Sequence, residues 1–200
     1  MKNSLRSLVL LVCFNLLVAC SPPQGGVEKT DSKFSSTDIT GADFPKPLIL
    51  ADLTGKLRTM SDFKGKVVML FFGYTHCPDV CPTTMSDLKK TMQLLGEKAN
   101  EVQVLFVTLD PARDTPEVLA QFVPSFDKRF IGLRGSLQET AETMANFKIF
   151  YAKVEGTTKG DYTIDHSSGM YAFNKEGKIR LYIAYATKPA DMAGDIEKLL

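Results

Sequence analysis

The sequence has few histidines, few cysteines and almost no net charge. It contains two histidines and four cysteines among 200 residues, and its formal net charge at pH 7 is +1. No basic stripe interleaves with aromatic residues, so nothing favours nucleic acid as a partner. Any chemistry that needs an imidazole must use His76 or His166. There is no internal repeat, and 44% hydrophobic residues suffice for one globular domain with a core.

Long apolar runs are also missing. The longest candidate near the N-terminus, Leu8 to Leu17, is shorter than the ~20 residues that a transmembrane helix needs. It follows the positive residues Lys2 and Arg6, a pattern typical of a signal peptide, which we assign to residues 1–19.

The segment Leu17-Val18-Ala19-Cys20 ends this signal and resembles a bacterial lipobox. The resemblance implies cleavage before Cys20 and attachment of a lipid to its sulfur. An ordinary signal peptide or an uncleaved anchor is the alternative. Residues 20–43 are predicted to be a flexible polar tether, and residues 44–200 the folded domain. The domain is therefore expected on the extracytoplasmic, periplasmic side, anchored to the membrane as a lipoprotein.

This organisation leaves only Cys77 and Cys81 in the mature domain, because Cys13 lies in the signal and Cys20 would carry lipid. Two cysteines exclude a disulfide scaffold in an oxidising compartment. Their spacing indicates a functional pair, with a local disulfide that braces a turn as the plainer alternative. They lie between an apolar run and a helical pattern, where a helix N-terminus favours the thiolate. Thiolates serve both redox chemistry and soft-metal binding.

Apolar runs and helical patterns alternate along the rest of the domain. We predict a three-layer α/β sandwich of the thioredoxin type, with a central mixed sheet flanked by helices. The methionines of the first helix fit a core stripe better than a set of thioether ligands. Strands are expected at 47–51, 56–60, 66–72, 102–109, 169–173 and 178–184, and helices from Pro82 to about Gly96, from Thr115, from Ser136 to Phe147 and from Pro189 to Leu200.

His166 is expected in a polar loop just before a strand, next to the cysteine loop. Cys77, Cys81 and His166 then form a candidate set of two sulfurs and one nitrogen, which suits copper, or zinc with a fourth ligand. A solvent-exposed loop histidine is the alternative for His166. Asp165 is expected to orient the loop or support a ligand, and Asp79 to cap the helix or shape its loop. For His76 we favour a structural or tuning role.

The segment Leu109 to Glu117 is a polar loop with two prolines. It follows a predicted buried strand, so it is expected at the same sheet edge as the cysteine loop. Turn and helix-cap chemistry explains its composition, and a rim that docks a partner is the alternative.

Three segments of the chain carry a family resemblance. They are Phe72-Gly73-Tyr74-Thr75-His76-Cys77-Pro78-Asp79-Val80-Cys81-Pro82, Thr108-Leu109-Asp110-Pro111-Ala112-Arg113-Asp114-Thr115-Pro116-Glu117, and Asp165-His166-Ser167 before Met170-Tyr171. Together, over about residues 44–200, they resemble the Sco/SenC/PrrC family of copper proteins. The resemblance implies a thioredoxin-like fold and one Cu(I) or Cu(II) ion bound by Cys77, Cys81 and His166, with Asp165 as the neighbouring acidic residue. It also implies a role in assembly of the CuA centre in cytochrome c oxidase subunit II, or of a related cuproprotein, by copper delivery, dithiol reduction or both.

Two other functions compete with a metallochaperone. A thiol-disulfide oxidoreductase would cycle Cys77 and Cys81, although such enzymes normally use C-x-x-C and this pair has one residue more. A redox sensor or peroxidase would need a low-pKa cysteine in a particular polar environment. Fold alone does not separate these functions. His166 does, because dithiol exchange has no need of it.

Overall fold

The computed structural model describes residues 33–44, 47–158 and 160–200, which belong to one compact unit, Ser32–Leu200. The predicted signal peptide and Cys20 lie outside these residues. Among the described residues, no helix combines the length and hydrophobicity needed to cross a membrane. The elements are β1 (Thr37–Asp38), β2 (Ile49–Asp52), β3 (Leu57–Thr59), η1 (Met60–Phe63), β4 (Val67–Gly73), α1 (Val80–Leu94), η2 (Gly96–Glu101), β5 (Val102–Thr108), α2 (Pro116–Phe126), β6 (Ile131–Arg134), α3 (Leu137–Asn146), β7 (Tyr151–Glu155), β8 (Tyr162–His166), β9 (Met170–Phe173), β10 (Ile179–Ile183) and α4 (Pro189–Glu197).

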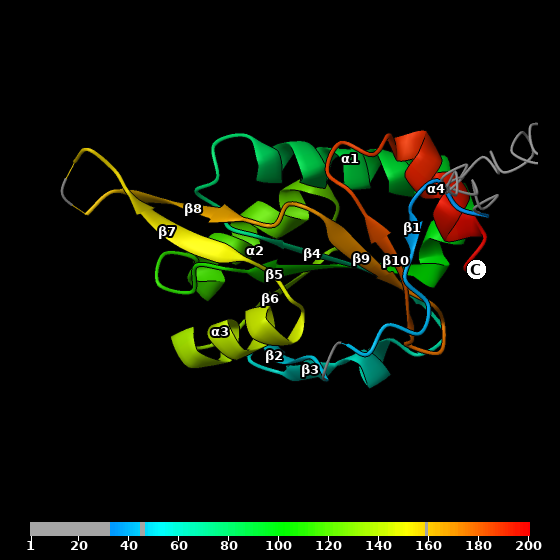
Figure 1. Ribbon diagram of the computed structural model, residues 1–200, viewed down its shortest axis with the longest axis horizontal. Helices are drawn as coiled ribbons and strands as arrows, with labels where there is room; N and C mark the ends of the chain where they lie inside the picture. Colours follow the sequence, from blue (N-terminus) through cyan, green and yellow to red (C-terminus); the bar gives the residue numbers. More distant parts are fainter. Residues whose placement is uncertain (1–32, 45–46, 159) are drawn as a thin grey trace, which may run out of the picture. The chain divides into compact units, whose positions relative to one another are not determined.

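An eight-stranded mixed sheet forms the middle layer, in the order β1-β10-β9-β4-β5-β6-β2-β3. β4, β5 and β6 are parallel, and the other neighbours pair antiparallel. The helices α1 and α4 cover one face of this sheet and α3 lies on the other (Figure 1). The predicted three-layer α/β sandwich with a mixed sheet is confirmed.

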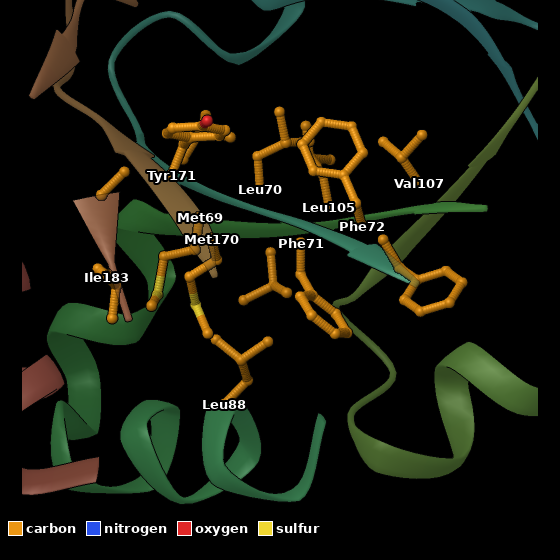
Figure 2. Packing of buried hydrophobic residues seen from close by; sticks show 14 of the residues in the cluster. Met69, Leu70, Phe71, Phe72, Leu88, Leu105, Val107, Met170, Tyr171 and Ile183 are labelled. Carbon is orange, nitrogen blue, oxygen red and sulfur yellow. The ribbon is translucent and has the colours of Figure 1, made fainter. Parts of the chain in front are cut away.

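β4 is buried along its whole length because helices cover both of its faces. Its side chains alternate, so that Met69 and Phe71 point toward Leu88 of α1 while Leu70 and Phe72 point to the opposite face (Figure 2). On that opposite face, Phe72 packs against Phe147 at the end of α3, with ring centroids 5.2 Å apart. The methionines predicted to form a core stripe on α1, Met85 and Met92, are buried in this core.

Local sequence signals correctly predict most of the other helices and strands. The capping box of Ser136 and Glu139 starts α3, and Thr115 caps α2. The turn before Lys178 joins β9 to β10, as predicted, and Gly55 takes a positive φ of 83° in the turn between β2 and β3. The last helix is three residues shorter than predicted, because α4 ends at Glu197.

The domain begins earlier than predicted. The sequence predicts that residues 33–43 belong to the tether. In the structure, however, Phe34 is buried and β1 pairs with β10. The backbone N–H groups of Ser35 and Ser36 donate to the buried carboxylate of Asp195 at 2.8 and 2.7 Å. The polar composition of this segment resembles a linker, and its order comes from contacts with residues about 160 positions away.

The short strand β6 and the hairpin β7–β8 were not predicted. The prediction that His166 lies in a loop is wrong, because this residue ends strand β8. β7 and β8 pair antiparallel in a separate two-stranded sheet that extends beyond the large sheet in Figure 1. The hairpin and the cysteine loop meet at one end of the molecule's core.

Candidate metal centre

The cysteine pair lies where β4 passes into α1. Cys77 and Cys81 are both free thiols, the first partly exposed and the second buried. The Cys77 sulfur accepts a hydrogen bond from the backbone N–H of Cys81, in the first turn of α1, at 3.3 Å. Asp79 occupies the N-cap position as predicted, but its carboxylate accepts no backbone N–H there and instead receives the Thr83 hydroxyl at 3.3 Å. The Cys77 sulfur therefore performs part of the capping expected of Asp79.

Gly73, the last residue of β4, leaves room for the Cys81 sulfur. A Cβ added at residue 73 would lie 2.9 Å from Cys81 Sγ and 3.1 Å from the rings of Phe106 and Phe71. Such contacts are closer than van der Waals packing allows, so the sulfur can reach this depth only over a bare backbone. Gly73 is thus part of the site's architecture, although no chemical property of its own marks it.

His166 approaches the cysteines from β8. Its Nε2 lies 3.8 Å from Cys81 Sγ. Its Nδ1 lies 2.9 Å from the carbonyl oxygen of Ser167, which can only accept a hydrogen bond. The geometry therefore assigns the proton to Nδ1 and leaves the Nε2 lone pair on the side of Cys81. Ser167 supplies the orienting contact that the sequence had suggested for Asp165.

The two thiols differ in acidity because each perturbs the other. Hydrogen bonding from the Cys81 thiol, supported by the backbone N–H groups of Cys81 and Asp79, lowers the pKa of Cys77 to about 5, against the effect of burial. The same thiol–thiolate hydrogen bond, together with burial, raises the pKa of Cys81 far above its ordinary value. At neutral pH the pair therefore holds one proton and one negative charge, with the charge on the more exposed sulfur.

A pocket of about 410 Å³ opens beside this pair. Its lining joins the cysteine loop to the hairpin strand, and Cys77, Asp79, Asp165 and His166 all contribute. Asp165 is exposed, as is Asp79. The structure thus brings every residue of the predicted set to one place, with Cys81 buried beneath Gly73.

The loop between β5 and α2 supports the cysteine loop from below. The buried Asp114 carboxylate accepts the Thr75 hydroxyl and the Thr108 hydroxyl, each at 2.6 Å, and also the Thr75 backbone N–H. His76 is exposed, with Nδ1 3.9 Å from Asp114, so its contact with the site is through this support. β4 and β5 are parallel neighbours, which brings the two loops to the same sheet edge, as predicted.

Within the residues that the structure describes, no three His, Cys, Asp or Glu side chains already have the spacing of a metal site. The donor types are nonetheless those that soft and borderline metals take, two sulfurs and an imidazole nitrogen.

Comparison with known proteins settles the family. The SCO1/SenC family model matches residues 36–200. The chain belongs to the SCO1/SenC family. The SCO2-like protein RC0895 of Rickettsia conorii is 33% identical over 178 residues, which cover 88% of this chain and 85% of the relative. The mitochondrial SCO2 homolog of Danio rerio is 38% identical over 138 residues, covering 68% of this chain and 48% of the relative.

Solved SCO structures share this fold. The copper-bound ScoI of Bradyrhizobium japonicum is 34% identical, with a TM-score of 0.72 over 78% of this chain and 99% of that one. The apo Sco1 of Thermus thermophilus is 35% identical, with a TM-score of 0.72 over 83% and 99%. The thioredoxin-like SCO architecture predicted from the motifs is therefore confirmed.

Sequence reasoning missed three contributors to this SCO site: Gly73, Ser167 and Asp114. The first two act through backbone atoms, which leave no mark in side-chain chemistry. Asp114 lies in the polar loop whose composition turn and helix-cap chemistry explains. Its carboxylate accepts a hydrogen bond from Thr75, which lies 39 positions earlier in the chain.

Proposed function

We propose that this protein binds one copper ion as cargo through Cys77, Cys81 and His166. Its role is to assist assembly of the CuA centre of cytochrome c oxidase subunit II or of a related cuproprotein. Membership of the SCO1/SenC family supports the role, and the copper-bound state of the Bradyrhizobium relative supports the metal. The donor set of two thiols and one imidazole supports the ligands.

The distance of 3.8 Å between Cys81 Sγ and His166 Nε2 carries the proposal. A metal ion held ~2.3 Å from a sulfur and ~2.0 Å from a nitrogen, at tetrahedral to trigonal angles, separates those two ligands by about 3.5–3.7 Å. The Cys81 sulfur and the His166 Nε2 are therefore already close to the spacing of two ligands of one ion. The hydrogen bond from Nδ1 to the Ser167 carbonyl holds His166 in the tautomer whose Nε2 faces the sulfur.

Loading must release the proton that the thiol pair retains. Cys77 is already a thiolate at neutral pH and is the more exposed sulfur, so it makes the first contact with incoming copper. The charge of the copper ion then replaces the proton on Cys81, which binds as a thiolate. Release to a partner begins at the same sulfur, because the more exposed Cys77 is the first that a partner's ligand can replace.

A copper titration of the reduced protein tests this function. We expect one equivalent of Cu(II), with thiolate-to-copper charge-transfer bands that are lost in Cys77→Ala, Cys81→Ala and His166→Ala. Protein with a Cys77–Cys81 disulfide is expected to bind no copper at this site, because a metal needs free thiolates. Unchanged Cu(II) affinity and spectrum in His166→Ala would show the ligand assignment to be wrong.

The acidity of Cys77 also favours a second function, thiol-disulfide exchange. The Cys77 thiolate would attack a partner's disulfide to form a mixed disulfide, and Cys81 would then displace the partner's thiol. The partner gains two electrons, one proton from Cys81 and one proton from solvent, and Cys77 and Cys81 become a disulfide. Retention of this activity in His166→Ala, combined with no specific copper binding by the wild type, would favour exchange as the main role.

The proposed location is extracytoplasmic, on the membrane. It rests on the signal pattern of residues 1–19 and on the lipobox-like position of Cys20. Intact mass measurement of the mature protein tests it, with a lipid mass on an N-terminal Cys20 as the expected result. In Cys20→Ser the lipid mass should be absent. An unmodified Cys20 in membrane-bound wild type would refute lipidation.

A further inference from the structure

The two halves of the site are supported very differently. Cys77 and Cys81 follow β4, a central strand of the eight-stranded sheet, whereas His166 belongs to the separate sheet of β7 and β8. A two-stranded hairpin is marginally stable by itself in water. Contacts outside the backbone ladders must therefore hold His166 opposite Cys81.

A cluster of three side chains attaches β8 to the loop that follows β5. The Asp110 carboxylate accepts from Arg113 Nε and, at 2.8 Å, from the hydroxyl of Tyr162, the first residue of β8. Arg113 Nη1 donates to the Tyr162 carbonyl at 2.9 Å. The Arg113 guanidinium carbon also lies 3.5 Å from the centroid of the Tyr162 ring. Tyr162 is thus held by its hydroxyl, its backbone and its ring face at once. We call Asp110, Arg113 and Tyr162 the hairpin clamp.

The same loop holds the other half of the site. Asp114, four residues after Asp110, binds Thr75 two residues before Cys77. Asp110 and Asp114 are both buried, so neither belongs to an exposed docking rim. The loop therefore has one buried carboxylate bonded to the cysteine loop and another bonded to the histidine strand.

Arg113 is the connecting member of the clamp. Its guanidinium stacks on Tyr162 and also lies 5.8 Å from the ring of Tyr74, whose ring centroid is 6.1 Å from that of His166. One of its nitrogens, Nη2, is buried without a hydrogen-bond partner among the described residues. A buried unpaired N–H is unfavourable, so the other contacts of this arginine must outweigh it.

We propose that Arg113 is a positioning residue, which sets the distance between His166 and the cysteine pair through the hairpin clamp. Tyr162 and His166 lie four residues apart on one strand, so both side chains share a face of β8, ~13 Å apart along it. A loosened Tyr162 lets this face tilt away from Cys81 without removing any ligand. The hydrogen bond from the Ile164 N–H to the Tyr74 hydroxyl, at 3.1 Å, remains, so the expected effect is a weakened site.

This inference rests on the proposed copper site for its metal readout, but the protein without metal tests it independently. The variants are Arg113→Lys, which keeps the charge and loses the planar fork, and Tyr162→Phe, which keeps the ring and loses the hydroxyl. The matched control is Arg58→Lys, because Arg58 Nε binds the buried Asp52 carboxylate at 2.7 Å in the other hairpin.

The first measurement is the imidazole nuclear magnetic resonance spectrum of the reduced, metal-free full chain in detergent. The chain has two histidines, so His76→Gln assigns the His166 signal. We expect one sharp His166 signal of the Nδ1–H tautomer in wild type and in Arg58→Lys. In Arg113→Lys and Tyr162→Phe it should shift toward the position of a solvent-exposed imidazole and broaden. If Arg113→Lys does not fold, Tyr162→Phe alone decides.

The second measurement is Cu(II) affinity by competition, with the electron paramagnetic spectrum. We expect both clamp variants to bind ~10-fold or more weakly, with altered nitrogen hyperfine structure, and Arg58→Lys to match wild type. His166 signals and copper spectra in both clamp variants equal to those of Arg58→Lys would overturn the inference. A wild type that binds no copper would refute the proposed function, whereas the metal-free spectrum would still decide the clamp.

Discussion

The molecule has two hairpins that are built in opposite ways. β2–β3 joins the large sheet through β6, and its Leu50 side chain is buried in the core. The Asp52 carboxylate ties its own turn together by accepting from Thr54 and Arg58. In β7–β8, four of the five β7 residues are exposed, and Phe150 just before it is 65% exposed. Apart from the buried Ile164 of β8, side chains of two loops, not a ladder of strands, connect this hairpin to the sheet.

The difference separates a hairpin that stabilises the fold from one that presents a ligand. A strand locked in a central sheet has one position, because its register fixes every side chain. A hairpin attached by a few polar contacts can adjust its position at little expense to the core. His166 is on the adjustable hairpin, and the buried Cys81 is on the fixed framework. The predictions below break or sharpen this contrast, from the largest expected effect to the smallest.

One apolar truncation in each hairpin should give the largest contrast. We expect Leu50→Ala to lower the free energy of unfolding by about 2–5 kcal/mol, because it leaves a cavity in the core. Val154→Ala in β7, where the side chain is 43% exposed, should change it by less than ~0.5 kcal/mol. Urea titrations of the reduced protein measure both. Equal losses in the two variants would mean that β7–β8 also stabilises the core.

The reactivity of Cys77 should depend on the fixed framework more than on the hairpin. With its pKa lowered to about 5, Cys77 should reach half of its maximal alkylation rate near pH 5 and lose reactivity below it. At pH 7 its thiolate fraction is about 30-fold that of a thiol of ordinary pKa near 8.5. Peptide-resolved mass spectrometry after iodoacetamide pulses measures this rate.

Two variants separate the contributions that lower the pKa of Cys77. Cys81→Ala removes the largest contribution and should move the half-maximal pH strongly upward. His166→Ala removes a smaller electrostatic contribution from the hairpin and should move it upward by less. A larger shift in His166→Ala than in Cys81→Ala would reverse the assignment.

Gly73→Ala tests the fixed half directly. The new Cβ would meet the Cys81 sulfur and two phenylalanine rings, so we expect a loss of about 1–3 kcal/mol in unfolding free energy. Cys81 must also shift, so copper binding should weaken even in protein that remains folded. Gly194→Ala is the control for the loss of a glycine, because the space around that residue is open and its φ is not positive. Normal copper binding in folded Gly73→Ala would show that Cys81 has more freedom than this packing implies.

The smallest expected effect is the loss of unfolding free energy at low pH that comes from Asp52 in the hairpin β2–β3. Burial alone would raise the pKa of Asp52, but hydrogen bonds from Thr54 and Arg58 outweigh it and hold the pKa at about 2. A carboxyl with a lowered pKa stabilises the fold above its unfolded value and loses that contribution as pH falls from about 4 to about 2. We expect Asp52→Asn to be on the order of 1–2 kcal/mol less stable at pH 7. Its stability should also fall less than that of wild type between pH 4 and 2, in denaturant titrations at each pH.

The same contrast explains what the sequence could predict. β4 was evident from a continuous apolar run, and α3 from the capping box of Ser136 and Glu139, because both signals are local. β7–β8 covers little of the core, so it lacks the alternating pattern that identifies a half-buried strand. Phe34 looked like part of a polar linker because its burial depends on α4 and β10.

The candidate ligands were found from residue chemistry and motif, whereas their supports were not. Cys77, Cys81 and His166 are rare residue types, so few positions compete for the role. Gly73 acts through its missing Cβ and Ser167 through its carbonyl oxygen. Neither feature marks a position in a sequence, because every glycine lacks a Cβ and every residue has a carbonyl oxygen. The clamp of Asp110, Arg113 and Tyr162 joins residues up to 52 positions apart, and only the folded chain brings them together.

The attachment of residues 34–38 has a mechanical consequence. A pull applied at this end of the domain first loads the hydrogen bonds of Ser35 and Ser36 to Asp195, then the pairing of β1 with β10. In sheet order, β10 and β9 lie between β1 and β4. The hairpin with His166 lies at the other end of the view from β1 and α4 (Figure 1). The contacts that carry a force applied at the N-terminal end of the domain thus lie far from the cysteine pair and His166. The distances among these three residues then stay unstrained under that force.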